Sequence, residues 1–220
     1  MQLNKNIPKD NYLIALHSSS ETFGVAIHNL KENKNDIKRA TFQTGRTLSN
    51  NLFSCIEQLL PYEKWNQITR LAVATGPGGF TGTRISIAMA RTIAQQLQCP
   101  LDGVSSFALM AQRLYKQKKE MEKKKYFWIT RSLKRRGLIG GKYIIQEQSE
   151  IPYCEKVLEL KSPYLLPKGI NFLPAIEAED NIYDDTLELL KISISANEVH
   201  KKSFWADILP IYPTSPVDNI

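Results

Sequence analysis

Apolar and polar residues alternate along the first hundred positions in the manner of an α/β domain. Three apolar runs bounded by polar turns predict strands, at residues 12–17, 23–30 and 37–43. Residues 48–60 then repeat apolar side chains at helical spacing, and Pro61 ends the predicted helix. The chain therefore opens with a three-stranded meander followed by a helix.

Residues 71–118 have the alternation of strands and helices that is typical of a parallel sheet. It predicts a buried strand at 71–75, a glycine turn, an Ala-rich helix at 84–97, a short strand at 101–104 and a helix that reaches about 118. Ser105 or Ser106 is suited to cap this last helix. Strands followed by strand, helix and strand indicate a mixed sheet covered by helices.

Beyond residue 125 the pattern is less regular. We expect a strand at 126–128 and a pair of strands at 138–139 and 142–145 that turn at Gly140-Gly141. Helices are predicted at 184–192 and 194–208. We expect two subdomains, residues 1–105 and 106–220, with the last helix packing back on the first.

The glycine-rich turn is the first candidate for chemistry. A strand, a glycine turn and a helix start point backbone N–H groups at an anion, whereas the bland alternative is a tight corner that packs closely. The segment lacks the lysine of a Walker A loop. The residues that would hold an anion or nucleotide are Gly76, Gly78, Gly79, Thr81, Gly82 and Arg84, with Thr81 as the expected helix cap.

This turn carries a family resemblance. Residues 76–84 read Gly-Pro-Gly-Gly-Phe-Thr-Gly-Thr-Arg, which resembles the Gly-Pro-Gly-Ser-Phe-Thr-Gly-Leu-Arg stretch of the TsaB (YeaZ) family. The likeness extends back to the first strand and onward to residues 100–106, about half of the chain. It implies the actin-like ATPase (RNase H-like) α/β fold, with a mixed sheet and a degenerate second subdomain.

The resemblance also implies a function. Members of this family are glycoprotease-like accessory subunits of tRNA threonylcarbamoyladenosine (t6A) synthesis. We expect a non-catalytic chain that binds a TsaD-like catalytic subunit and supports threonylcarbamoyl transfer to adenosine 37 of ANN-decoding tRNAs. A TsaE-like ATPase would be a further partner, tRNA would be met through the complex, and ATP and a metal would belong to that complex.

Departures from the family pattern favour a non-catalytic member. Residues 17–20, His-Ser-Ser-Ser, stand where the family usually has Asp-Thr-Ser, and Mg²⁺ prefers oxygen ligands to a neutral histidine. Leu48 and Ser49 stand where the family often has His-Ser, and Thr130 to Ser132 replace an Asp-Ala-Arg-Arg-like stretch. The three histidines are far apart, so neither a metal site nor a peptidase site is expected. The alternative function is a stand-alone nucleotide- or phosphate-binding enzyme of the actin-like superfamily.

The helix at 84–97 has two apolar stripes and so requires burial on two sides. The family meets TsaD through this helix and the one before it, and small side chains would let a partner helix approach. The predicted partner interface comprises Leu52, Ile56, Ile85, Ala88, Met89 and Thr92. Burial within the domain is the alternative, and a homodimer could use the same face in isolation.

Charge is unevenly distributed. Of the net +7, residues 113–142 contribute twelve Lys/Arg against two acids, a local +10, so the rest of the chain sums to −3. This segment is either a tRNA-binding patch or a solvated helix end and linker. The candidate tRNA contacts are Lys118, Lys119, Lys123, Lys124 and Lys125.

Composition bounds the remaining possibilities. Three widely spaced cysteines argue against a disulfide framework, and no apolar run approaches the roughly 18 residues of a membrane span. The polar N-terminus lacks the apolar core of a signal peptide. We therefore expect a cytoplasmic protein.

Overall fold

The computed structural model describes residues 10–33, 36–118 and 125–214. A five-stranded sheet forms the first unit, in the order β3-β2-β1-β4-β5. Its strands are β1 (Tyr12–His17), β2 (Thr22–Asn29), β3 (Ile37–Gln43), β4 (Ile68–Ala74) and β5 (Leu101–Val104). The first three form an antiparallel meander, whereas β4 runs parallel to both β1 and β5. The sheet is thus mixed, as predicted.

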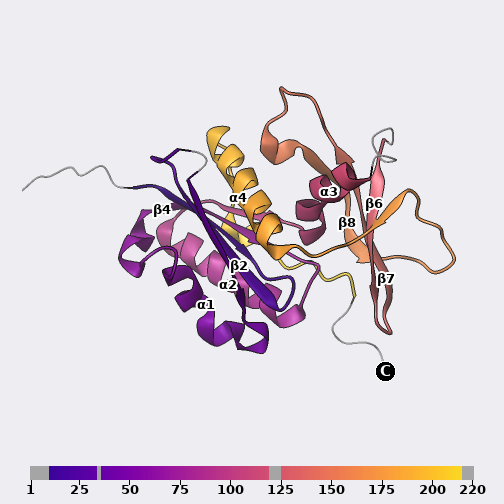
Figure 1. Ribbon diagram of the computed structural model, residues 1–220, viewed down its shortest axis with the longest axis horizontal. Helices are drawn as coiled ribbons and strands as arrows, with labels where there is room; N and C mark the ends of the chain where they lie inside the picture. Colours follow the sequence, from indigo (N-terminus) through magenta and orange to yellow (C-terminus); the bar gives the residue numbers. More distant parts are fainter. Residues whose placement is uncertain (1–9, 34–35, 119–124, 215–220) are drawn as a thin grey trace, which may run out of the picture.

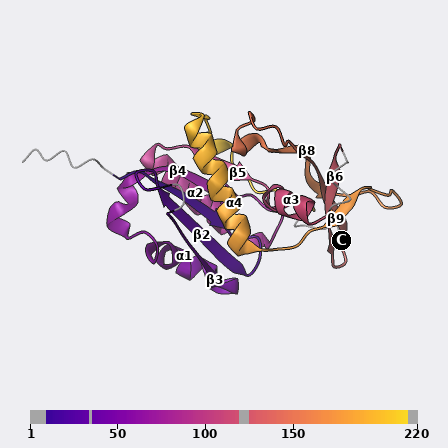
Figure 2. The same ribbon diagram turned by 45° about the horizontal axis from the view of Figure 1, so that its top comes forward.

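Helices cover both faces of this sheet (Figure 1). Helices α1 (Leu48–Glu57) and α2 (Phe80–Leu97) lie on one face, and α4 (Ile182–Glu198) lies on the other (Figure 2). Alternate side chains of β1 serve the two cores: Leu16 packs in the cluster with α1 and α2, and Ala15 packs in the cluster with Leu189 of α4. Because α4 is supplied by the last third of the chain, the first sheet is completed by residues distant in sequence.

A second sheet lies beside the first (Figure 1). Its order is β8-β7-β6-β9, with β9 parallel to β6 and the other pairs antiparallel. The strands are β6 (Phe127–Leu133), β7 (Gly137–Ile145), β8 (Val157–Leu165) and β9 (Ala175–Glu177). Helix α3 (Ser106–Gln117) packs on this sheet through Phe107 and Leu114, and the side chain of Ser105 caps it by accepting from the N–H of Ala108.

Short 3-10 helices join these elements. They are η1 (Gly45–Thr47), η2 (Tyr62–Gln67), η4 (Tyr153–Glu155) and η5 (Trp205–Asp207). Across the described residues, every helix is too short or too polar to cross a lipid bilayer.

Several predicted boundaries were wrong. Strand β7 runs unbroken through Gly140 and Gly141, and the hairpin turns instead at residues 134–136. A Cβ on Gly140 would lie 2.8 Å from the side chain of Leu166, so these glycines allow close packing rather than a turn. The predicted helices at 184–192 and 194–208 are one helix, α4, that ends at Glu198.

Helix ends also differed from the predictions. Helix α2 begins at Phe80, four residues early, with Gly79 at its N-cap position. Thr81 therefore lies in the first turn and does not cap the helix. Helix α1 ends at Glu57, three residues before the predicted end, because a turn precedes Pro61.

Candidate functional site

The glycine-rich turn lies where three parallel strands end. The N–H of Thr75 donates to the carbonyl of Val104 (2.9 Å), and the N–H of Ser106 donates to the carbonyl of Gly76 (2.7 Å). The carboxyl ends of β1, β4 and β5 therefore meet at this turn. In open α/β sheets this edge is where ligands bind.

Close contact with the β1–β2 turn explains the glycine at position 78. The N–H of Gly79 donates to the carbonyl of Ser19 (2.8 Å), and a Cβ on Gly78 would overlap the backbone of Ser19. Gly76 has a φ of 92°, which favours glycine. The tight-corner interpretation of the glycine turn thus has direct structural support.

Beside this turn is a cavity of about 400 Å³, which we call the hairpin cleft. Such a volume lies within the range that small ligands occupy. Three segments far apart in the sequence line it: the glycine turn with Ser19, the β6–β7 hairpin, and residues 210–214. The lining residues are Ser19, Pro77, Gly78, Gly79, Phe80, Thr83, Arg131, Leu133, Lys134, Arg136, Ile139, Pro210, Ile211, Tyr212, Pro213 and Thr214.

The hairpin cleft is electropositive. Arg131, Lys134 and Arg136 line it, and its described lining contains no acidic residue. Arg131 forms an ion pair with Asp180 at 2.6 Å, so its charge is partly balanced. The start of α2 adds the positive end of a helix dipole. This electrostatic environment favours an anion.

One buried hydroxyl in the cleft lacks a partner. Thr83 is 5% exposed, and its Oγ1 has no hydrogen-bond partner among the described residues. A buried hydroxyl without a partner costs free energy, and a ligand atom or a water molecule in the cleft would remove that cost. Thr83 was not among the predicted site residues, and it stands where the family pattern has leucine.

An aromatic pair flanks the cleft. The guanidinium of Arg84 lies 3.6 Å from the ring centre of Phe80 and 4.9 Å from that of Tyr212, and its Nε donates to the Tyr212 hydroxyl. Phe80 remains 45% exposed and Tyr212 43%. Of the six predicted anion-site residues, Gly78 and Gly79 line the cleft, and Arg84 lies beside it in this stack.

His17 ends β1 and is completely buried. Burial lowers its pKa from 6.5 to about 4, and the nearby charge of Asp180 opposes this shift. Its Nδ1 lies 3.4 Å from the N–H of Ser19, and its Nε2 has no partner among the described residues. The strand end therefore presents a neutral imidazole and hydroxyls rather than a carboxylate, a poor fit to a magnesium–nucleotide complex.

The structure divides the predicted partner interface. Leu52, Ile56 and Met89 are buried at 2%, 1% and 8% exposure in the chain's own core, so they have almost no surface to offer a partner. Ile85 is half-buried, whereas Ala88 and Thr92 are exposed. These two residues lie on the outer surface of α2 and remain candidates for the interface.

An exposed aromatic residue on helix α1, which packs beside α2, was missed by sequence reasoning. Phe53 of α1 is 55% exposed and stacks on Trp65 with ring centres 5.8 Å apart. It stands outside the apolar stripe that defines the helix, so periodicity gave no reason to select it. We call the exposed surface of Phe53, Ala88 and Thr92 the outer helical face.

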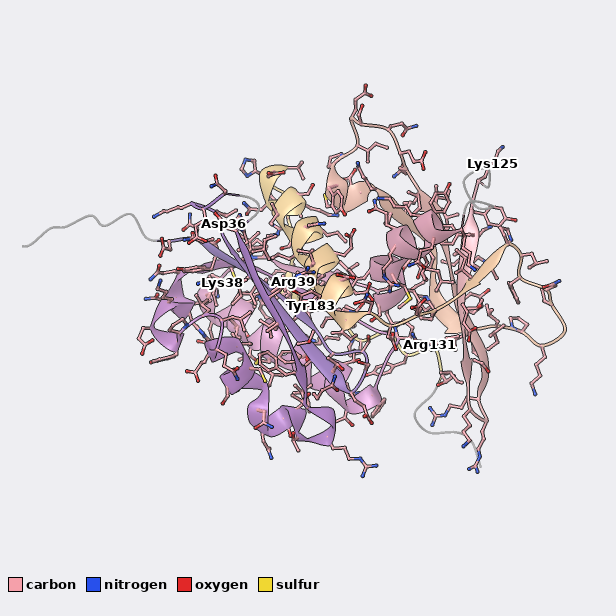
Figure 3. All side chains as sticks on the ribbon, in the orientation of Figure 1. Asp36, Lys38, Arg39, Lys125, Arg131 and Tyr183 are labelled. Atoms are coloured by element: carbon pink, nitrogen blue, oxygen red, sulfur yellow. The ribbon has the colours of Figure 1, made fainter. Side chains whose placement is uncertain are left out.

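The basic segment is split in space. Lys118 and Lys125 are exposed, whereas Lys119, Lys123 and Lys124 lie outside the described residues. Lys125 precedes β6 and the hairpin turn follows it, so the two groups of cations lie at opposite ends of that strand (Figure 3). The predicted patch is therefore not one continuous surface with the hairpin.

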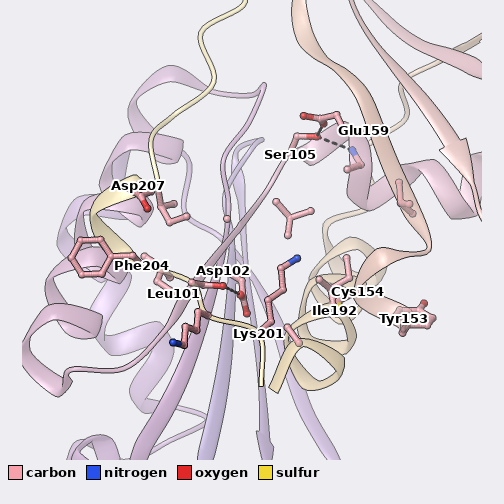
Figure 4. Close-up of a pocket in the computed structure, with 18 residues that line it drawn as sticks. Leu101, Asp102, Ser105, Tyr153, Cys154, Glu159, Ile192, Lys201, Phe204 and Asp207 are labelled. Carbon is pink, nitrogen blue, oxygen red and sulfur yellow. Dashed lines mark hydrogen bonds between the residues drawn. The ribbon is translucent and has the colours of Figure 1, made fainter. Parts of the chain in front are cut away.

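A second pocket of about 380 Å³ lies between β5, α4 and residues 201–208 (Figure 4). Its buried carboxylate, Asp102, accepts two hydrogen bonds from Arg70, at 2.7 and 2.8 Å, and one each from Ser193 and Ser203. Glu159 accepts from Tyr143 and Ser105. These carboxylates are bonded within the chain, so the pocket offers fewer groups to a ligand than the hairpin cleft does. No cluster of three metal-ligating side chains occurs in the described part of the chain.

Structural comparison shows the fold. A Pseudomonas aeruginosa protein described as similar to peptidase YeaZ superposes with a TM-score of 0.68 at 20% identity, covering 93% of this chain and all of the other. YeaZ from the same organism gives 0.65 at 20% identity, over 92% and 99%. The predicted actin-like (RNase H-like) α/β fold is confirmed.

Sequence comparison shows the family. Residues 42–125 match the family model described as TsaD, tRNA N6-adenosine threonylcarbamoyltransferase. The tRNA threonylcarbamoyladenosine biosynthesis protein TsaB of Buchnera aphidicola subsp. Acyrthosiphon pisum is 23% identical, over 76% of this chain and 88% of that protein. TsaB of Buchnera aphidicola subsp. Baizongia pistaciae is 30% identical over 67% of this chain and 73% of its own length. From this identity over most of a curated relative, together with the shared fold, the chain belongs to the TsaB (YeaZ) family.

Proposed function

We propose that this chain is a non-catalytic subunit of tRNA t6A synthesis. It binds a TsaD-like catalytic subunit and supports threonylcarbamoyl transfer to adenosine 37 of ANN-decoding tRNAs. Support comes from the relatives named as TsaB t6A biosynthesis proteins. A role in tRNA modification places the chain in the cytoplasm.

The observation that carries this proposal is the outer helical face. Ala88 is exposed and small, and the hydroxyl of Thr92 donates to the Ala88 carbonyl at 2.9 Å, so neither side chain needs a polar partner. Small residues let a second helix approach closely, and Phe53 on the neighbouring helix α1 supplies an exposed apolar anchor. This combination fits a helical partner.

Catalysis belongs to the partner in this proposal. The described site offers a neutral histidine and hydroxyls where a metal-dependent enzyme needs carboxylates. ATP and a metal therefore enter with the TsaD-like subunit, and a TsaE-like ATPase joins the same complex. Without a partner, the outer helical face can pair with a second copy of itself as a homodimer.

The test is complex formation with the TsaD-like subunit from the same source, measured by light scattering. Ala88→Trp should weaken the heterodimer at least tenfold, because the indole prevents close approach of the partner helix. Lys191→Trp, on the exposed side of α4 across the sheet, is the matched control and should bind like the wild type. Wild-type affinity of a folded Ala88→Trp protein would contradict the proposal.

The positive hairpin cleft favours a second candidate, a stand-alone nucleotide- or phosphate-binding enzyme. Calorimetric titration of the isolated chain with ATP and Mg²⁺ separates the two. Tight ATP binding with ATP turnover would support the stand-alone enzyme. The absence of both binding and turnover would support the non-catalytic subunit.

A further inference from the structure

We propose that the hairpin cleft and its aromatic pair, Phe80 and Tyr212, bind single-stranded RNA directly. The choice of RNA rests on the proposed function, whereas the site rests on the structure. The lysine run at 118–125 was one candidate for RNA contacts, with a solvated helix end and linker as the alternative. The structure instead places cations, aromatic rings and backbone donors together at a different location.

The first argument is charge. Lys134 and Arg136 stand on the β6–β7 hairpin at the wall of the cleft, and both residues are exposed. Arg84 adds a third exposed cation from α2. The described lining of the cleft contains no acidic residue, and Arg136 donates to the Thr214 hydroxyl at 3.3 Å. A groove with cations along its rim follows a phosphate backbone, and each phosphate bound releases counterions.

The second argument is the aromatic pair. The rings of Phe80 and Tyr212 lie 5.8 Å apart, and each residue keeps nearly half of its surface exposed although Arg84 lies against both. Exposed rings interleaved with arginine are the platform on which single-stranded bases stack. Burial in the core does not explain their position, because both lie on the surface.

The third argument is the buried wall of the cleft. The start of α2 forms part of this wall through Gly79, Phe80 and Thr83, and the Oγ1 of Thr83 has no partner among the described residues. Backbone N–H groups at a helix start and a free hydroxyl are donors that suit one phosphate. The hydrogen-bond donors in the cleft would bind one phosphate, and the cations and aromatic rings at its rim would contact neighbouring nucleotides. The site is therefore longer than one nucleotide.

The test is fluorescence anisotropy of the isolated full chain with a labelled, unstructured RNA of about 12 nucleotides at about 50 and 200 mM salt. The double variant Lys134→Ala/Arg136→Ala should bind at least about fivefold more weakly and lower the salt slope by about 1.4. Lys38→Ala/Lys202→Ala, which removes two exposed lysines elsewhere, is the matched control and should bind like the wild type.

The aromatic contribution is tested separately. Phe80→Ala should weaken binding by about fivefold or more. Phe80→Leu should show a comparable loss, because it keeps apolar bulk for folding but has no ring. Tyr62→Ala, at a residue that is 68% exposed on η2, should have no effect.

Three results would overturn the inference: no RNA binding at low salt, equal losses in the cleft variants and their controls, or displacement of the RNA by stoichiometric free ATP, which would indicate a mononucleotide site. The heterodimer measurement separates this failure from failure of the proposed function. If the wild-type chain forms the heterodimer but does not bind RNA, only this inference is contradicted. RNA binding without a heterodimer contradicts only the subunit proposal.

Discussion

Replacement of His17 by asparagine should remove the proton that binds at residue 17 when the protein unfolds at acidic pH. His17 is completely buried, and burial lowers its pKa from 6.5 to about 4. The unfolded chain therefore binds a proton at this residue between these two pH values, whereas the folded chain does not. The stability that this neutral histidine provides is complete above pH 6.5 and is lost as the pH falls towards 4. A shift of about 2.5 pH units corresponds to about 3 kcal/mol of unfolding free energy.

The assay is urea unfolding followed by circular dichroism near pH 7.5, 5.5 and 4. Asparagine does not titrate, so the variant should lose about 3 kcal/mol less than the wild type across this range. Burial raises the pKa of Asp185 to about 6, so its contribution to the unfolding free energy grows as the pH falls. Asp185 is present in both proteins, and its contribution cancels in the comparison.

His200→Asn is the matched control. His200 is exposed and has a φ of 53°, which asparagine tolerates. This variant should follow the wild-type pH dependence. Parallel stability curves for wild type and His17→Asn would refute the assignment of a neutral buried imidazole.

Two further predictions concern stability. Asp102→Asn should cost about 3–5 kcal/mol in urea unfolding, because Arg70 is 2% exposed and would remain as a buried cation without its anion. Replacing both Arg70 and Asp102 by leucine should recover much of this loss, and equal losses in both variants would argue against the charge effect. Gly78→Ala should lower the unfolding free energy by more than about 2 kcal/mol, because its Cβ would overlap the backbone of Ser19. Gly79→Ala, whose nearest contact would be 3.9 Å away, should change it by less than about 0.5 kcal/mol, and similar thermal midpoints for the two variants would contradict the predicted overlap.

Local patterns predicted the first sheet well. Strands β1 and β3 have the predicted bounds, and α3 is capped by Ser105, one of the two serines predicted for that position. Each of these features depends on neighbouring residues, because alternation defines a strand and a cap needs only a hydroxyl before the first turn.

Predictions failed where a residue serves a distant contact. Gly140 and Gly141 have the composition of a turn, but they lie within β7 because Leu166 and Tyr143 pack against them. Two helices were predicted at 184–192 and 194–208, yet Ser193 lies within an unbroken α4 and its hydroxyl donates to the buried carboxylate of Asp102. Neither contact is visible in the local sequence.

The sequence by itself determined the family, the glycine turn and the order of the elements as far as α3, because motifs and hydrophobic periodicity are properties of adjacent residues. Only the tertiary structure decided which residues are free to bind. It buried Leu52 and Ile56 in the core, and it brought residues 77–83, 131–139 and 210–214 together as one cleft. Those three segments are separated by about fifty residues or more of chain, and their proximity follows from the packing of both units rather than from any local preference.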